Sequence, residues 1–356
     1  MVDPFAIGKI LLLSTLAFVV AIAWTPALTH FLYKYRLGKS IRSAVKAPMF
    51  AELHKKKAGV PTMGGTLMWG TALFLALFFA LIAGLFPSSP LAPLSFLTRS
   101  QTWLPLAVLV AAGLVGIVDD LFNILKIGPD GGGIRFRERI VLYTIIAAIG
   151  AWWFYFKLGF DALHIPFAGD ISIGPWYILL FILVIVATSF SVNQTDGLDG
   201  LAGGTLASAF AAYAIIALLE GKFELAALCG VIVGATLAFL WFNIYPARFI
   251  MGDTGAMSLG VTLGVVAMLT NTVALLPIIG IVFVVEALTT LIQIASKKLV
   301  KMKLLQKKVF LIAPIHHHFE AKGWPEPKVV MRFWVISWIG AGIGLILALL
   351  DPSFFS

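Results

Sequence analysis

Two aspartates at the border of an apolar run are the first candidates for chemistry in this sequence. Residues 193–200 have the sequence NQTDGLDG, so Asp196 and Asp199 lie three residues apart and each is followed by glycine. Strongly apolar runs at 176–192 and 201–219 enclose this segment. Carboxylates so close to membrane-compatible sequence are costly and usually mark a functional site. We therefore expect a site at this segment.

The neighbours of these acids indicate what the site could bind. If the segment begins a helix, Asp196 and Asp199 lie on one face, and the positive end of the helix dipole favours both charges. Asn193 and Thr195 add neutral oxygen atoms beside them. Such hard oxygen ligands, without cysteine, suit Mg²⁺ or Mn²⁺ better than zinc. A plain capping role at the start of a helix is the alternative that the spacing leaves open.

Three more carboxylates occupy comparable positions. Asp119 and Asp120 are adjacent at the end of the third apolar run. There they repel each other and oppose the helix dipole. No lysine or arginine lies one helical turn away in either direction, so a divalent-cation or general-base site explains the pair better than a structural role. Asp253 lies between glycines just before another apolar run.

Basic and imidazole side chains lie in the same set of loops. Arg135, Arg137 and Arg139 follow a glycine-rich turn, and they either bind phosphate or anchor the next span. The lysine run that ends at Lys57 precedes a glycine-rich helix start, which fits an anion site and a membrane anchor equally well. The three consecutive histidines 316–318 cannot all face one ion in regular structure. Contacts to phosphate or sugar oxygens are the better interpretation.

The elements that hold these residues must be membrane helices. The 356 residues are 60% hydrophobic and 12% charged, with a mean hydropathy of +0.99. Repeated apolar runs of about 18 residues or more are long enough to cross a bilayer. No polar block is long enough for a separate soluble domain, so residues 1–356 are expected to form one integral membrane unit. The single Cys229 excludes a disulfide framework and a thiolate metal cluster.

We expect an all-α polytopic protein with about ten membrane-spanning helices. The predicted spans are 6–33, 63–86, 103–122, 140–157, 175–192, 200–219, 225–242, 255–271, 273–296 and 330–349. Of the 26 basic residues, 22 lie in the alternate loops 34–60, 123–139, 243–254 and 297–332. By the positive-inside rule these loops face the cytoplasm and both termini are periplasmic. The candidate site residues then line a cleft on the cytoplasmic face.

The loop distribution explains the net charge of +9 without a nucleic-acid partner, since basic loops anchor membrane proteins at anionic headgroups. No Gly-x-x-x-x-Gly-Lys-Ser/Thr pattern is present, which argues against ATP-driven transport. Acids and bases on one membrane face fit metal-assisted phosphoryl transfer. Glu286 lies inside the ninth predicted span with no partner identified, and the outward loop 158–174 is expected to form a small hairpin with His164 on its surface.

Six sequence blocks follow one another in an order typical of one enzyme family. They are PTMGG at 61–65, DD at 119–120, NQTDGLDGLA at 193–202, FLWFN at 239–243, MGD at 251–253 and APIHHHFE at 313–320. Together they resemble the polyprenyl-phosphate N-acetylhexosamine-1-phosphate transferases. The continuation KGWPEPK at 322–328 and RFW at 332–334 is similar to the branch that transfers phospho-N-acetylmuramoyl-pentapeptide. The resemblance extends from about residue 34 to residue 334.

The resemblance implies a ten-span enzyme of the bacterial inner (plasma) membrane. The implied reaction moves phospho-N-acetylmuramoyl-pentapeptide from UDP-MurNAc-pentapeptide to undecaprenyl phosphate and gives lipid I and UMP, the first membrane step of peptidoglycan synthesis. Mg²⁺ is the implied cofactor and a homodimer the implied assembly. The lipid phosphate attacks directly, or the reaction passes through an aspartyl-phosphate on Asp120 or Asp199. The alternatives are a related transferase for another UDP-amino sugar and a secondary transporter.

Residue roles carry over from the family position by position. By this resemblance Asp253 is the Mg²⁺ ligand and Asp119 is the base that deprotonates the lipid phosphate, with Asp120 beside it as a further catalytic residue. The nucleotide and metal cleft is lined by Asn193, Asp196, Asp199 and Asn243. Its rim and its sugar-phosphate side carry Lys57, Thr62, Arg139, the catalytic candidate His316, His317 and His318.

Four positions depart from the family pattern. Asn123 stands where a lysine is usual, Phe190 where an asparagine is usual, Ile250 where an aromatic residue is usual, and Ala256 where a serine is usual. Lys126 and Arg135 are the candidates to replace the lysine, and Phe249 is the candidate to supply an aromatic surface for the nucleoside.

Overall fold

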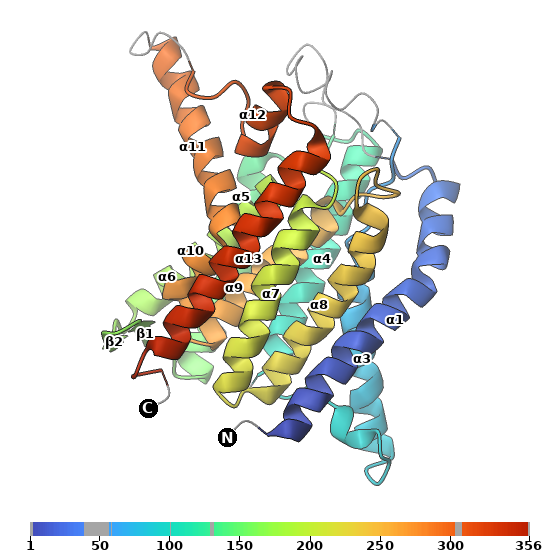
Figure 1. The fold of residues 1–356 in the computed structure, drawn as a ribbon, viewed down its shortest axis with the longest axis vertical. Helices are drawn as coiled ribbons and strands as arrows, with labels where there is room; N and C mark the ends of the chain where they lie inside the picture. Colours follow the sequence, from blue (N-terminus) through green and yellow to red (C-terminus); the bar gives the residue numbers. More distant parts are fainter. Residues whose placement is uncertain are drawn as a thin grey trace.

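The protein is a bundle of membrane-length helices with one small hairpin (Figure 1). The computed structural model describes residues 3–38, 57, 59–99, 101–128, 132–302 and 308–354. The elements in chain order are α1 (Pro4–Lys34), α3 (Thr66–Leu85), η2 (Ala92–Leu94), α4 (Trp103–Ile124), α5 (Phe136–Trp152), η4 (Trp153–Lys157), β1 (Ala162–Ile165), β2 (Gly169–Ser172), α6 (Trp176–Thr195), α7 (Leu201–Leu219), α8 (Phe223–Asn243), α9 (Gly252–Leu269), η5 (Val273–Leu275), α10 (Leu276–Ile279), α11 (Ile281–Lys301), α12 (Ile315–Ala321) and α13 (Glu326–Leu350).

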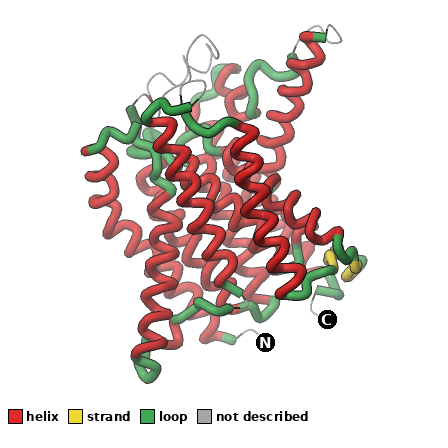
Figure 2. The backbone as a smooth tube through the Cα atoms, turned by 180° about the vertical axis from the view of Figure 1, so that it is seen from behind, coloured by secondary structure: helices red, strands yellow, loops and turns green. Residues whose placement is uncertain are grey.

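The helices match the expectation of a polytopic membrane protein. Among the described residues, nine helices are long and apolar enough to cross a membrane, and there are up to ten crossings if a bent pair counts as one span. The two ends of the chain lie at the same end of the bundle (Figures 1 and 2), as an even number of crossings requires. The opposite end carries α12 and the loop between α6 and α7 (Figure 1).

The ninth predicted span, 273–296, is a bent pair of helices and not one continuous helix; the pair is long and apolar enough to count as one span. The segments Val273–Ile279 and Ile281–Lys301 meet at an angle of 82°. Gly280 ends α10 with φ −99° and ψ 31°, outside the helical region, and α11 starts directly after it. Pro277 restricts the preceding turn, because proline lacks an N–H and fixes φ. Composition shows the apolar length of this segment but not the break.

α9 is the buried centre of the bundle, since every residue of its membrane-length window is buried. It packs against α4 and α6. Small residues permit the close approach: a Cβ on Gly116 of α4 would overlap the backbone of Thr254, and a Cβ on Gly260 would lie 2.8 Å from the Cα of Ser189. Small residues at helix contacts are typical of membrane bundles. This packing brings the start of α9 beside the ends of α4 and α6.

The predicted hairpin in loop 158–174 is confirmed, but His164 is not on its surface. β1 pairs antiparallel with β2, and His164 stands opposite Asp170. The imidazole lies between two carboxylates, with Nδ1 2.7 Å from Asp170 and Nε2 2.7 Å from Asp351. Asp351 follows α13, so the C-terminal segment contacts the hairpin and His164 is only 7% exposed. The expectation of a surface histidine is therefore wrong.

Candidate active site

Asp196 and Asp199 lie in a loop between helices and not at the start of one. α6 ends before Asp196, which is its C-cap, and α7 begins after Gly200. Gly200 has φ +83°, a left-handed conformation that separates the acids from the regular helix. The condition under which the two acids would share one helical face, that the segment begins a helix, is therefore not met. Asp196 accepts a hydrogen bond from the N–H of Gly252 at 3.2 Å, which ties this loop to the start of α9.

The adjacent acids at the end of α4 face different partners. Both Asp119 and Asp120 are fully buried. Asp120 accepts hydrogen bonds from the Thr62 hydroxyl at 3.1 Å and from the N–H of Thr254 at 3.1 Å. Asp119 accepts the N–H of Ile134 at 2.7 Å. Separate donors for each carboxylate offset the repulsion that two neighbouring charges would otherwise feel. Thr62, which was expected at the rim of the cleft, is fully buried.

Arg139, in the first turns of α5, links two acids from other helices. Its Nε lies 2.7 Å from Asp119 Oδ2, and its Nη1 lies 3.2 Å from Asp253 Oδ1. The side-chain amide of Asn193 donates to the same Asp253 oxygen. A guanidinium suits this position because it offers several donors in a rigid fork. The ends of α4 and α6 and the starts of α5 and α9 therefore meet at one buried polar centre.

Arg139 also lies close to Asn123, the position where the family has a lysine. A Cβ on Gly133 would lie 3.7 Å from both Arg139 Nη2 and Asn123 Nδ2, so these two side chains border the same space. Lys126 and Arg135 are exposed. The cation paired with the acids is thus neither of the two expected replacements.

Lys57 belongs to a second network that joins distant parts of the chain. Its Nζ lies 2.8 Å from Asp199 Oδ1 and also contacts Glu326 Oε1. The same Glu326 oxygen accepts the N–H of Asp199 at 2.7 Å, and Asp199 Oδ2 accepts the N–H of Ala247 at 3.0 Å. The two carboxylates raise the pKa of Lys57 above its ordinary value, although burial by itself would lower it. Lys57 therefore remains a cation in a largely buried position.

Asn243 and Phe249 are buried and connect neighbouring loops. Asn243 is 4% exposed; its carbonyl accepts the N–H of Gly200 at 2.9 Å, and its amide donates to the carbonyl of Phe249 at 2.9 Å. Phe249 is fully buried, with its ring 5.8 Å from that of Phe239 and 5.9 Å from that of Phe242. The interpretation of Phe249 as a replacement stacking surface is therefore wrong, because its ring is fully buried and packs beside Phe239 and Phe242.

The three histidines have different environments. His316 and His317 are buried at the start of α12, and a Cβ on Gly197 would overlap His316 Nε2 and lie 3.2 Å from His317 Nε2. These two rings therefore lie against the loop that carries Asp196 and Asp199. His318 is partly exposed and accepts the N–H of Leu311 at 3.2 Å. The structure thus brings two of the three to the acidic loop.

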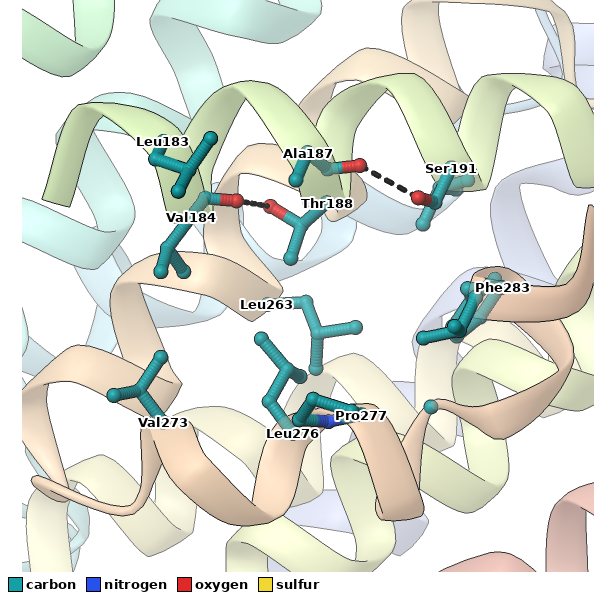
Figure 3. A pocket seen from close by; sticks show the side chains of 13 residues that line it. Leu183, Val184, Ala187, Thr188, Ser191, Leu263, Val273, Leu276, Pro277 and Phe283 are labelled. Carbon is teal, nitrogen blue, oxygen red and sulfur yellow. Dashed lines mark hydrogen bonds between the residues drawn. The ribbon is translucent and has the colours of Figure 1, made fainter. Parts of the chain in front are cut away.

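An apolar cavity of about 220 Å³ opens where α10 and α11 bend, beside α6 (Figure 3). Leu263 of α9, Pro277 and Phe283 project toward it. The hydroxyl groups of Thr188 and Ser191 are hydrogen-bonded to carbonyls one turn earlier, at 3.0 and 2.7 Å, so they add little polarity. The cavity reaches Val192 on α6, the residue before Asn193 of the buried centre.

Glu286 and Glu326 are central residues whose partners the sequence does not reveal. Glu326 follows Pro325 and looks like an ordinary first-turn acid of α13. Its partner Lys57 is 269 residues away, so no local pattern could indicate the pair. Glu286 is recognisable as a costly acid inside an apolar span, but its partner His316 comes from a separate short helix.

The oxygen donors fit a magnesium ion that is shared with substrate phosphates. Within the described residues, no three His, Cys, Asp or Glu side chains are arranged to hold a metal ion by themselves. Mg²⁺ commonly takes only one or two carboxylates, and phosphates and waters complete its octahedron. Asp253, with the Asn193 amide and Asp119 nearby, supplies such hard oxygen ligands.

The fold and the site define a bundle of membrane-length helices with buried carboxylates and cations at one end. Residues 102–271, which hold most of this polar centre, match the family described as Glycosyl transferase family 4, so the class is that of a membrane-embedded transferase.

Curated proteins similar over nearly the full chain define the family more closely. A phospho-N-acetylmuramoyl-pentapeptide-transferase of Chloroflexus aggregans is 39% identical over 97% of this chain and 91% of its own length. Proteins of the same name from Desulfatibacillum aliphaticivorans (37% identical, 96% of this chain and 91% of the relative) and Geobacillus sp. strain WCH70 (38%, 93% and 95%) are similar to the same extent. The chain belongs to the phospho-N-acetylmuramoyl-pentapeptide-transferase family.

Proposed function

We propose that the protein transfers phospho-N-acetylmuramoyl-pentapeptide from its UDP carrier to undecaprenyl phosphate, with lipid I and UMP as products. The observation that carries this proposal is an identity of 36 to 39% with transferases of that name across nearly the whole chain. The match covers both the membrane bundle and the polar centre. We therefore propose the nucleotide-sugar donor and the lipid acceptor together.

In the proposed reaction an oxygen of the lipid phosphate attacks the β-phosphorus of the UDP-sugar. The bond from that phosphorus to the bridging oxygen breaks, and UMP leaves with the oxygen. Cations that are already in place stabilise the charge on the phosphate oxygens without reorganisation. Arg139 and Lys57 fit this role, because neighbouring carboxylates hold each of them in position. Mg²⁺ held by Asp253 would screen the diphosphate as a Lewis acid.

Asp119 is the proposed base for the lipid phosphate. Its ion pair with Arg139 favours the charged carboxylate, so it accepts a proton most readily once Arg139 turns toward phosphate. A covalent route through Asp120 or Asp199 is less well supported. Both oxygens of each of these carboxylates are engaged by donors, and nucleophilic attack would break those contacts.

The apolar cavity beside α6 suits the isoprenoid chain of the lipid substrate (Figure 3). A chain lying there reaches the buried centre along α6, since Val192 borders the cavity and Asn193 contacts Asp253. The distribution of basic residues supports a cytoplasmic site, periplasmic termini and the bacterial inner membrane as the location. A homodimer through membrane helices completes the proposal.

UMP release by the purified protein tests this function. We expect release from UDP-MurNAc-pentapeptide only when undecaprenyl phosphate and Mg²⁺ are both present. UDP-N-acetylglucosamine serves as the matched donor, because it carries the same nucleotide without the lactyl-peptide arm. Release from that donor alone would assign the chain to another amino-sugar transferase. No release from either donor, in a membrane mimic that keeps the protein folded, would favour transport.

A further inference from the structure

Glu286 is a buried acid of α11 that the proposed reaction leaves without a role. Its side chain is fully buried, and its Oε2 lies 2.8 Å from Nδ1 of His316, which is fully buried as well. A carboxylate inside an apolar span is costly unless it is paired, and acids retained at such positions usually serve function. The bond also connects the membrane bundle to α12, outside the spanning segments.

This bond determines which nitrogen of His316 faces the acidic loop. Nδ1 faces the Glu286 carboxyl group, so Nε2 is the nitrogen on the opposite side of the ring. A Cβ on Gly197 would overlap Nε2 and lie 2.8 Å from Cε1, so the ring edge is packed directly against that glycine. The ring of His317 lies 4.0 Å from that of His316 and restricts its rotation. Nε2 is therefore directed at the segment that joins Asp196 and Asp199.

Glu286 lies about one helical turn along α11 from a residue that lines the apolar cavity. Phe283, which lines that cavity (Figure 3), precedes Glu286 by three residues on α11, so the two share one helical face. The pair therefore contacts the Asp196–Asp199 loop through His316 and belongs to the same helix as Phe283 of the cavity.

We propose that Glu286 is a positioning residue of the transferase, which holds His316 in one tautomer and one orientation against the Asp196–Asp199 loop. This inference rests on the proposed transferase function. A carboxylate behind a histidine fixes the ring and its tautomer in many catalytic and metal sites, and loss of such a partner costs about 10- to 100-fold in activity. If the pair were merely structural, removal of Glu286 would lower the stability of the protein without a selective loss of turnover.

The variant Glu286→Gln tests the proposal, because it keeps the side-chain shape and removes the charge. We expect kcat for UMP release to fall about 10- to 100-fold, while the KM for UDP-MurNAc-pentapeptide and the melting temperature in detergent stay near wild type. In a His316→Ala background the same change should cause no further loss, since Glu286 acts through His316. Glu286→Asp retains the carboxylate and should lose less than Glu286→Gln.

The control is Glu220→Gln, which neutralises a partly buried glutamate at the C-cap of α7, at the other end of the bundle, and should leave kcat unchanged. Wild-type kcat in Glu286→Gln, or a loss that multiplies with that of His316→Ala, would overturn the inference. If Glu286→Gln does not fold, the same cycle with Glu286→Asp decides, because any loss must vanish without His316. A wild-type protein that releases no UMP would instead refute the proposed function.

Discussion

Replacement of Arg139 tests the buried polar centre, because this one side chain holds acids from two other helices. Arg139 reaches Asp119 through Nε and Asp253 through Nη1. A lysine at position 139 has one ammonium group in place of this rigid fork, so we expect it to keep only one of the two contacts at its present geometry. Each charge-assisted hydrogen bond contributes about 1.5–3 kcal/mol. At about 1.4 kcal/mol per tenfold change, loss of one contact lowers kcat/KM roughly 10- to 150-fold. We therefore expect Arg139→Lys to fold and to be slow.

Arg139→Ala is the more severe change, because it leaves both carboxylates without their cation. Breaking a fully buried pair costs about 3–5 kcal/mol. The cost here should lie below that range, since the Arg139 side chain is 21% exposed and solvent screens part of the interaction. We expect a lower melting temperature in detergent together with a larger loss of kcat/KM. Arg137→Ala is the control, because Arg137 is exposed on the same turn of α5 and should remain near wild type.

The assay is the initial rate of UMP release at saturating undecaprenyl phosphate, with thermal unfolding measured on the same preparations. The reasoning is refuted if Arg139→Lys retains wild-type kcat/KM. It is equally refuted if Arg137→Ala loses as much activity as Arg139→Lys, since the effect would then reflect the charge of α5 and not the bridge between acids.

Three further predictions concern single positions. Asp253→Asn should lower Mg²⁺-dependent UMP release at least about 100-fold while unfolding stays cooperative, and unchanged turnover across a Mg²⁺ titration would contradict its role as ligand. Gly197→Ala places a methyl group on His316 Nε2, so both kcat and the melting temperature should fall; a wild-type melting curve would show that the contact can yield. For His164, burial by itself lowers the pKa, but hydrogen bonds to its two carboxylate partners raise it above the ordinary 6.5. The stabilisation of the fold by protonated His164 is therefore complete below about pH 6.5 and is lost as the pH rises through the raised pKa. The melting temperature should decline over that pH range in the wild type but not in His164→Gln.

The membrane architecture could be predicted because apolar length alone identifies a span. The break in the helix at Gly280 could not be predicted from the sequence. Glycine and proline are tolerated within membrane helices, so Pro277 and Gly280 do not indicate by themselves whether a helix continues. His164 was misplaced for a related reason: the residue that covers it, Asp351, comes from the far end of the chain, and only the packed bundle brings them together.

At the candidate site, the sequence indicates which residue types matter but not how they pair. The acids and the histidines were identifiable as costly polar groups beside apolar runs. The bridge from Arg139 to Asp253 spans 114 residues, and it depends on how closely α9 packs against its neighbours. The role of Asn243 as a tie between backbone segments also follows from packing, since an asparagine at a helix end equally suits a ligand or a cap.

The central claim is that this chain joins a phosphosugar to a lipid phosphate in one displacement. The most direct measurement quantifies UMP and the lipid-linked product together, in a single reaction of purified protein with UDP-MurNAc-pentapeptide, undecaprenyl phosphate and Mg²⁺. We predict equal amounts of both products and no UMP when the lipid phosphate is omitted. UMP formed without lipid, together with phosphorylated protein, would contradict direct attack, and the absence of both products would contradict the transferase function itself.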